Sequence, residues 1–348
     1  MSGGSGARLR VDLGRIRANV DALRARIGDA EVMLVVKNDA YGHGVERVVA
    51  DAAAHGVARF GSFDVPTGVR ARAAAGPDAR VFAWVTVGRK EVAAAIDARL
   101  ELGVGDRDYL EDVAAVSRGR GVPVHLKIDT GLHRNGVRPE DWAGFVGRAA
   151  ALEASGDIRV VGLWSHIAET SEAADDAARA EFLAGVDAAR AAGLSPRTLH
   201  LAASAAGYAR PEFRFDMVRF GAFCYGVRST DGPELPGIAP AATLLAPVVA
   251  VDADTVEIGV GALDGVPSTL AQRFAVGTVA GARRVRAVGD VSLTVEAWPG
   301  ATPGQDVAVF GPGALGESSA TTLAEAIGTV GEEILVRVSP LVPRDYVG

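Results

Sequence analysis

The stretch MLVVKNDAYGHGVERVVADAAAHGVARFGSF, residues 33–63, contains one complete unit of a strand–helix–strand pattern. It opens on MLVV (33–36), a short apolar run typical of a buried strand, and a polar turn with two glycines follows. Residues 46–55 are rich in alanine and charged residues, which favours a helix, and RFGSF (59–63) predicts the next strand. A helix between two strands is the building unit of a parallel sheet.

The same pattern continues on both sides of this unit over the first two thirds of the chain. Strands are predicted at 33–36, 59–63, 80–85, 100–104, 124–128, 159–164, 198–202 and 217–220. Helical stretches lie between them, among them 46–55, 67–75, 108–118, 140–153, 172–193 and 205–209. Eight such repeats predict an α/β fold with a (β/α)8 TIM barrel. An open doubly wound sheet is disfavoured, because no Gly-x-Gly-x-x-Gly follows the first strand.

The pattern changes after about residue 235. Short valine-rich runs separated by Gly, Pro and Asp occur at 247–251, 255–260, 274–280, 291–295, 306–310 and 333–338. These runs predict a C-terminal β-strand domain at 238–348, joined to a barrel at 1–237 through the linker TDGPELPG (230–237). Residues 8–12 form one more β-like run, which we expect could join the β domain.

The composition excludes several classes of function. A chain of 348 residues suits one large domain and a smaller one, and a net charge of -7 argues against binding to nucleic acid. The single cysteine, Cys224, can form neither an intramolecular disulfide nor a cysteine metal cluster. The N-terminus lacks the apolar core of a signal peptide, and no apolar run reaches the roughly 18 residues of a membrane span. We therefore expect a cytoplasmic protein with no membrane partner.

Lys37 stands directly after the first barrel strand, in VVKNDAYGHG (35–44). Active sites of such barrels lie at the carboxyl ends of the strands. A lysine at this position, just past buried apolar residues, loses solvation, which favours its neutral amine. A neutral amine can form a Schiff base with an aldehyde. On its own the position also fits a lysine that extends to solvent.

Six segments in order resemble one family. VKNDAYGHG is similar to the cofactor-lysine motif of the alanine racemases, which are fold-type III enzymes dependent on pyridoxal 5'-phosphate (PLP). The other five are KIDTGLHRNG (127–136), GLWSHIAET (162–170), LHLAASAA (199–206), DMVRFGAFCYG (216–226) and LVPRDY (341–346). The resemblance therefore spans almost the whole chain, and it implies a PLP-dependent, isomerase-like enzyme of amino acid metabolism.

The resemblance assigns roles to particular residues. Lys37 would hold PLP and act as a base on the substrate α-proton. Tyr41, Ser204 and the backbone N–H groups of the Gly221 turn would bind its phosphate, which hydroxyls and turn amides can do.

Four further residues complete this set. His166 would orient groups under the cofactor ring, and Arg219 would face the pyridine nitrogen and keep it unprotonated, because a guanidinium is always charged. Lys37, His166 and Arg219 would form the catalytic set. Arg134 would contact the phenolic oxygen of the cofactor or the substrate carboxylate, and Lys127 would be its structural partner, carbamylated in many family members.

The remaining histidines carry no such assignment. His43 and His200 lie in motif segments without a chemical role, and we expect His55, His125 and His133 to be structural or exposed. Their spacing predicts no metal site.

The chain departs from the family where the second proton carrier should stand. The family supplies a tyrosine from the partner subunit's β domain, within Gly-Tyr-Ala-Asp-Gly. The matching segment here is GALDGVP (261–267), and the tyrosine position is Ala262. A methyl group carries no proton, and the loss of one proton carrier costs about a hundredfold to ten-thousandfold in rate.

Three more departures accompany this one. VGDVSLTVEA (288–297), which contains Ser292, lacks the Met-Asp-Gln of the family, whose Met-Asp pair meets the substrate carboxylate. Pro340 replaces a phosphate-binding tyrosine that some members carry, and Ala203 stands where Asn is usual. Most of these changes concern the substrate side of the site or the cofactor rim.

The sequence thus predicts a racemase-like or epimerase-like PLP enzyme with an altered second base. Another reaction on a larger amino acid, such as a decarboxylation or another lyase reaction, remains an alternative, and so does a non-catalytic PLP-binding protein. The resemblance also implies a homodimer in which the β domain of one subunit completes the site of the other.

Overall fold

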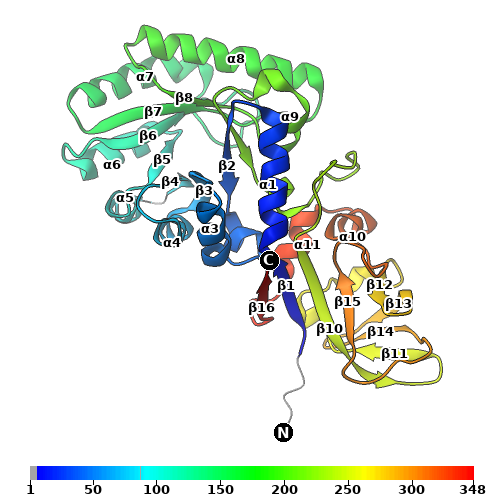
Figure 1. Cartoon of the computed structure of the whole chain (residues 1–348). Helices are drawn as coiled ribbons and strands as arrows, with labels where there is room; N and C mark the ends of the chain where they lie inside the picture. The colour runs from blue at the N-terminus through cyan, green and yellow to red at the C-terminus, as the bar shows by residue number, and fades with distance from the viewer. Residues whose placement is uncertain (1–5, 87) are drawn as a thin grey trace. The chain divides into compact units, whose positions relative to one another are not determined.

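The computed structural model describes residues 6–86 and 88–348 of the chain. These residues form two compact units, which contain the elements labelled in Figure 1. Unit 1 comprises the residues up to Ala22 together with Asn38–Gly44 and Ala222–Gly348, and unit 2 comprises Leu23–Lys37 and Val45–Gly221. Two helices cross this division, α1 (Leu13–Ile27) and the short α2 (Lys37–Tyr41).

Unit 2 contains the predicted parallel barrel. Its sheet has the order β8-β7-β6-β5-β4-β3-β2-β9, and every pair of neighbouring strands is parallel. The eight strands predicted from the sequence are confirmed: β2 (Glu31–Val35), β3 (Arg59–Asp64), β4 (Arg80–Val85), β5 (Glu101–Val104), β6 (Val122–Lys127), β7 (Ile158–Trp164), β8 (Thr198–His200) and β9 (Met217–Phe220). Backbone bonds from Asp216 N to Leu199 O and from Arg219 N to Ala202 O join the two end strands.

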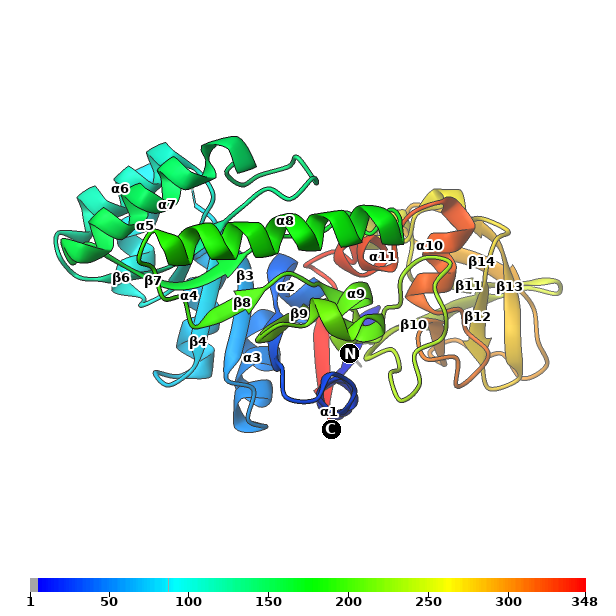
Figure 2. The same ribbon diagram turned by 90° about the horizontal axis from the view of Figure 1, so that it is seen from above.

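Helices lie on the outside of these strands (Figures 1 and 2). Several begin at a capping side chain that accepts a bond from the first helical turn, as Asp64, Asp106 and Ser171 do. The helices of unit 2 are α3 (Val45–Ala54), α4 (Val65–Ala75), α5 (Gly88–Asp97), α6 (Arg107–Ser117), α7 (Pro139–Ala154), α8 (Glu172–Ala191) and α9 (Ser204–Ala209), followed by the 3-10 turn η1 (Pro211–Phe213).

Large rings fill the barrel interior because glycines on the strands leave room for them. Phe82 and Trp164 are buried there with Met33 and Met217. A Cβ on Gly103 would lie 2.9 Å from the Phe82 ring, and one on Gly162 would lie 2.1 Å from Nδ1 of His125. These distances are too short for real carbon contacts, so the backbone at Gly162 makes the burial of the His125 ring possible.

Unit 1 contains a closed antiparallel barrel with two added strands. The pairing order is β11-β14-β13-β12-β15-β10, and β10 also pairs with β11, which closes the ring. Residues 8–12 form β1, which pairs with β10 and, in parallel, with β16. The strands are β1 (Arg8–Asp12), β10 (Ala242–Val251), β11 (Thr255–Ile258), β12 (Ala275–Thr278), β13 (Gly281–Val288), β14 (Leu293–Glu296), β15 (Asp306–Phe310) and β16 (Arg344–Val347).

One predicted strand of this unit is wrong. Residues 333–337 belong to helix α11 (Gly331–Arg337) rather than to a strand, and Val338 follows as the C-terminal cap of the helix. Ile334, Leu335 and Val338 are buried, and this i, i+1, i+4 spacing is that of a helix face. Glu332 and Glu333 lie in its first turn, where negative charge stabilises a helix. The unit also contains α10 (Ala320–Ile327) and the 3-10 turns η2 (Ala222–Tyr225), η3 (Ala262–Asp264) and η4 (Ser268–Leu270).

Among the residues described, none of the helices combines the length and the apolar character that crossing a bilayer requires.

Gly162→Ala tests the packing of the barrel interior. The added methyl group has to displace the His125 ring, so we expect a loss of about 1–3 kcal/mol in the free energy of unfolding. A methyl group added at Gly147, which is exposed on α7, would meet no atom within 4 Å, so Gly147→Ala should instead stabilise by roughly 0.5–1 kcal/mol. Urea unfolding of both variants measures the difference, and equal stabilities would contradict the packing.

Candidate active site

The carboxyl end of the unit 2 barrel gathers most of the residues predicted from the sequence. Lys37 follows β2 directly after Val36, Lys127 ends β6, and His166 comes just after β7. The charges of Lys37, Lys127, Arg134 and Arg219 all act on the ring of His166. The structure therefore brings these residues to one place at the mouth of the barrel.

Arg219 is the most extensively bonded side chain of this group. It is buried on β9, where Nη1 donates to His200 O (3.0 Å) and Nη2 donates to the carbonyls of Leu201 (2.8 Å) and Ser165 (2.9 Å). Burial, together with the charge of Arg134, lowers its pKa to about 9, so the guanidinium stays charged at neutral pH. No residue in the described part of the chain accepts a bond from its Nε–H.

His166 is held as a neutral ring. Its Nδ1 lies 3.1 Å from Nη2 of Arg219, and because arginine cannot accept, this nitrogen is the acceptor. Burial and then the charges of Arg219 and Arg134 lower the pKa of His166 to about 2. At neutral pH its single proton is therefore on Nε2.

Lys127 is a buried amine among positive charges. Its Nζ lies 4.5 Å from the centre of the Trp164 ring. Burial and the charges of Arg219 and Arg134 lower its pKa to about 7, against an ordinary value of 10.5. A large part of the Lys127 amine is therefore neutral at neutral pH, which is the form that reacts with carbon dioxide.

Arg134 lies on an exposed loop that Asp129 fastens. Asp129 Oδ1 accepts from the backbone N–H groups of Gly131 (3.1 Å) and His133 (3.0 Å), and Oδ2 lies 3.0 Å from His133 Nδ1. Sequence reasoning assigned no role to Asp129, although a carboxylate two residues before a glycine is a signal for such a turn.

Ser204 and Gly221 form a small group of polar atoms on α9 and at the end of β9. The Gly221 N–H lies 3.3 Å from Ser204 Oγ, to which it donates. Ala203 precedes Ser204 as the N-terminal cap of α9 and offers no side-chain bond to the helix. The hydroxyl of Ser204 therefore accepts from the Gly221 amide and keeps its own proton for donation.

The turn after Lys37 has a strained backbone. Asn38, Asp39, Ala40 and Tyr41 have φ angles of 52°, 55°, 54° and 54°. The left-handed region costs about 1–2 kcal/mol for each residue that has a side chain. Strain of this kind is typical of functional turns.

Tyr41 belongs to unit 1. Its ring packs on that of Tyr225, with the centroids 4.9 Å apart. Burial, with the negative charge of Glu332, raises the pKa of Tyr41 above its ordinary range, so the hydroxyl stays protonated.

Three of the four departures from the family, at Ala262, Ser292 and Pro340, lie in unit 1, whereas Ala203 is in unit 2. Ala262 is in η3, where its N–H donates to Gly289 O (2.9 Å), and the N–H of Leu263 donates to Asp290 O (2.9 Å). The N–H of Ser339, the neighbour of Pro340, donates to Asp264 O (2.9 Å). This surface, which we call the departure surface, exposes apolar side chains at Leu263 (73%), Val291 (67%) and Leu341 (91%).

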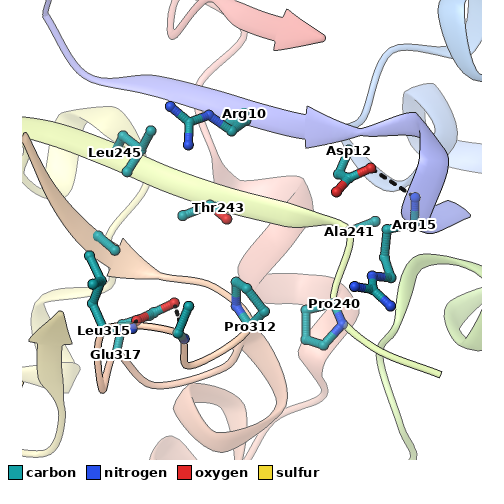
Figure 3. A pocket seen from close by; sticks show the side chains of 12 residues that line it. Arg10, Asp12, Arg15, Pro240, Ala241, Thr243, Leu245, Pro312, Leu315 and Glu317 are labelled. Carbon is teal, nitrogen blue, oxygen red and sulfur yellow. Dashed lines mark hydrogen bonds between the residues drawn. The ribbon is translucent and has the colours of Figure 1, made fainter. Parts of the chain in front are cut away.

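A cavity of about 260 Å³ in unit 1 is not part of the candidate site (Figure 3). Its carboxylates already have partners, since Asp12 accepts from Arg15 N (2.8 Å) and Glu317 accepts from the backbone N–H of Leu315 (2.9 Å). It is lined by Arg10, Asp12, Arg15, Pro240, Ala241, Thr243, Leu245, Ala308, Pro312, Ala314, Leu315 and Glu317. None of the residues predicted for cofactor binding is among these.

The sequence did not predict that two histidines meet in the barrel interior. His125, expected to be structural or exposed, and His200, which had no assigned role, are both fully buried and lie 2.9 Å apart, from Nδ1 of His125 to Nε2 of His200. His125 alternates with buried apolar residues on β6, and this alternation was the signal for an inward side chain.

Comparisons with known proteins agree over nearly the whole chain. Residues 11–229 match the family described as alanine racemase, N-terminal domain, and residues 248–346 match alanine racemase, C-terminal domain. The alanine racemase of Thermobifida fusca is 36% identical over 379 aligned residues, covering 98% of both chains.

Solved structures give the same result. The alanine racemase of D-cycloserine-producing Streptomyces lavendulae superposes with a TM-score of 0.94 at 31% identity, covering 99% of this chain and 97% of that one. The alanine racemase of Bartonella henselae, solved with covalently bound pyridoxal phosphate, has a TM-score of 0.88 over 99% of both chains. At 18% identity, the similarity to the Bartonella henselae structure shows a shared fold and nothing more.

The pKa of Lys127 predicts how stability depends on pH. Between about 7 and 10.5 the unfolded chain keeps a proton that folded Lys127 has released, so this residue makes the free energy of unfolding rise with pH. Lys127→Met should remove that rise. Urea unfolding at about pH 7 and about pH 9, in buffers free of carbon dioxide, measures it, with Lys90→Met on an exposed helix position as the control. If the free energy of unfolding changes by the same amount between these two pH values in wild type and in Lys127→Met, the shifted pKa of Lys127 is contradicted.

Proposed function

Because the chain belongs to the alanine racemase family of PLP-dependent isomerases, we propose that Lys37 holds PLP at the mouth of the unit 2 barrel and acts there on the α-carbon of an amino acid. The observation that carries this proposal is the arrangement around Arg219. A charged guanidinium, the neutral ring of His166 and the amines of Lys37 and Lys127 meet where parallel strands end.

The residues present fit the cofactor. PLP is anionic, and the positive charges of Arg219 and Arg134 favour an anion at the mouth. Both Nη groups of Arg219 are already bonded to neighbours, which leaves Nε–H as the donor for the pyridine nitrogen. We assign Ser204 Oγ, the Gly221 amide and Tyr41 to the phosphate. The amide, which donates to Ser204 Oγ in this structure, would donate to the phosphate instead.

PLP, when bound, supplies the electron-withdrawing ring that makes the α-proton of an amino acid acidic. The chain's own residues then determine which protons move. Arg219 keeps its charge, so it opposes protonation of the pyridine nitrogen beside it and limits side reactions of the ring. Lys37 serves as the base on one face of the substrate, and His166, bonded to Arg219 through Nδ1, holds that guanidinium in its place.

Borohydride reduction tests the assignment of Lys37. The chain has three lysines, Lys37, Lys90 and Lys127, so a reduced cofactor adduct can be mapped without ambiguity by digestion and mass spectrometry. We expect the adduct on the peptide that contains Lys37, and we expect Lys37→Ala to lose the visible absorption band of the bound cofactor. Lys90→Ala should keep both. An adduct on Lys127 or Lys90 in the wild type would refute the assignment.

We propose further that the second face of the substrate is served differently from that in the family, across a homodimer. Ala262 occupies the position of the family's tyrosine, and the segment at 288–297 is shortened beside it. The exposed side chains of Leu263, Val291 and Leu341 support burial of this surface against a second subunit. The small side chain at 262 also favours an amino acid larger than alanine, on which decarboxylation or another lyase reaction becomes a competing outcome.

Ala262→Tyr tests the second face. A phenol restored at this position should raise alanine racemisation at least about tenfold, because general acid–base catalysis contributes about a hundredfold or more. Deuterium uptake and chirality of the product measure the gain, and product mass detects decarboxylation. Leu263→Tyr, one residue along the same turn, is the control. Wild-type racemisation of alanine at a rate usual for PLP racemases would contradict an altered second base.

Hybrid dimers extend the same test to the sharing of sites. Chains that carry both Lys37→Ala and Ala262→Tyr have no cofactor lysine of their own. Mixed with wild-type chains, they should raise racemisation only if the β domain of one subunit serves the site of the other. A mixture no more active than the wild type alone would show that the sites are not shared.

A further inference from the structure

A continuous chain of buried polar side chains runs through the barrel interior below Arg219. Nη1 of Arg219 lies 3.1 Å from Nδ1 of His200, and Nε2 of His200 lies 2.9 Å from Nδ1 of His125. Nε2 of His125 then lies 2.9 Å from Oε2 of Glu101. Both histidines have no exposed surface, and Glu101 is 8% exposed. The mouth of the barrel is thus connected by hydrogen bonds to Glu101, the first residue of β5.

The two ends of this chain determine the direction of every bond in it. Arginine only donates, so Nδ1 of His200 accepts. Burial, with the charges of Arg219 and Arg59, lowers the pKa of His200 well below its ordinary value, so the ring is neutral and carries its proton on Nε2. That proton is donated to Nδ1 of His125, and the proton of His125 is therefore on Nε2, from which it is donated to the carboxylate of Glu101.

Glu101 is a carboxylate anion at the amino end of the barrel strands, and neighbouring groups stabilise its charge. Burial raises its pKa, but the hydrogen bond from His125, with the charges of Arg59 and Arg80, leaves the pKa below its ordinary value. Arg59 Nη1 lies 3.8 Å and Arg80 Nε lies 3.9 Å from its oxygens. Arg59 is in turn paired with Glu31 on β2. The acceptor that ends the chain is therefore a charged carboxylate.

Packing prevents the two imidazole rings from turning. The ring of Trp164 is stacked on His200 at an interplanar angle of 6°, and the ring of Phe82 lies 4.8 Å from that of His125, centre to centre. Gly162 leaves the space that His125 occupies. Each ring can change its hydrogen bonds only by moving its proton from one nitrogen to the other.

Stability alone does not account for this arrangement. Buried polar networks cost desolvation, and well-packed apolar residues in their place are often as stable or more stable. An apolar set would leave Nη1 of Arg219 without the acceptor at Nδ1 of His200. The network therefore acts through the acceptor that it provides to Arg219.

We propose that Glu101 and His125 are positioning residues for Arg219. The carboxylate keeps the proton of His125 on Nε2, which keeps the proton of His200 on Nε2 and leaves Nδ1 of His200 free to accept from Arg219. The guanidinium is thereby held with Nε–H toward the cofactor nitrogen. This inference rests on the proposed PLP site, and it extends that site from the mouth of the barrel to the amino end of β5.

Glu101→Gln removes the charge that directs the chain. The glutamine amide can donate to Nε2 of His125, so both histidines can move their protons to Nδ1. A proton on Nδ1 of His200 faces the N–H of Arg219 and displaces the guanidinium. We expect the absorption band of the bound cofactor to shift. We also expect the holoenzyme to lose its cofactor roughly tenfold faster, by analogy with the effect of mutating residues that hydrogen-bond to the ligands of a bound metal. Glu101→Asp, which keeps the charge, should retain much of the wild-type behaviour.

Nitrogen-15 NMR of the histidine side chains reads the bond direction itself. The chain has six histidines, so the signals are few. In the wild type, His125 and His200 should both be neutral with the proton on Nε2, and Glu101→Gln should add signals of the Nδ1–H form. Glu317→Gln, which removes another buried carboxylate but in unit 1, should change neither the histidine signals nor the cofactor band.

Each outcome decides the proposal. A proton on Nδ1 of His200 in the wild type would overturn it, and so would a Glu101→Gln holoenzyme with an unchanged cofactor band and rate of cofactor loss. If Glu101→Gln does not fold, His125→Asn breaks the same chain and should give the same cofactor changes. A wild-type protein that binds no PLP would end the proposed function, and the histidine signals of wild type and Glu101→Gln would then decide the bond direction by themselves.

Discussion

The structure of the barrel mouth depends on the burial of one guanidinium among neutral acceptors. Arg219 is 5% exposed, and its two Nη groups face backbone carbonyls and the Nδ1 atoms of His166 and His200. A buried charge is tolerated only when its hydrogen bonds are satisfied. Every neighbouring group therefore has to present an acceptor, and this requirement sets the protonation of both histidines.

The same charge acts on the other titratable groups of the mouth. Together with burial it lowers the pKa of Lys127 to about 7 and that of His166 to about 2. The mouth thus combines one permanent cation with a neutral ring and an amine near neutrality, which suits an anionic cofactor. The interior below it continues the arrangement through His125 to the carboxylate of Glu101, so the core of the barrel and its candidate site are one hydrogen-bonded structure.

Unit 1 presents the opposite chemistry at the departure surface. Backbone bonds join the turn of Ala262 to the segment at 289–290 and to the residue before Pro340. Leu263, Val291 and Leu341 are exposed there. Three of the four changes, although distant in the sequence, thus share one apolar surface of unit 1, which fits their proposed common effect on the second face of the substrate.

The sequence by itself determined the parallel barrel and the place of Lys37, because buried parallel strands read as continuous apolar runs and a polar residue at the end of such a run is easily seen. It also indicated most of the second unit's strands. It did not distinguish the helix at 331–337 from a strand, since a short apolar run fits both periods. Only the tertiary structure decided that His125 meets His200, 75 residues away, and that the turn of Ala262 meets Pro340's neighbour. Local patterns encode which side chains are buried, whereas strand register and chain closure decide which buried groups become partners.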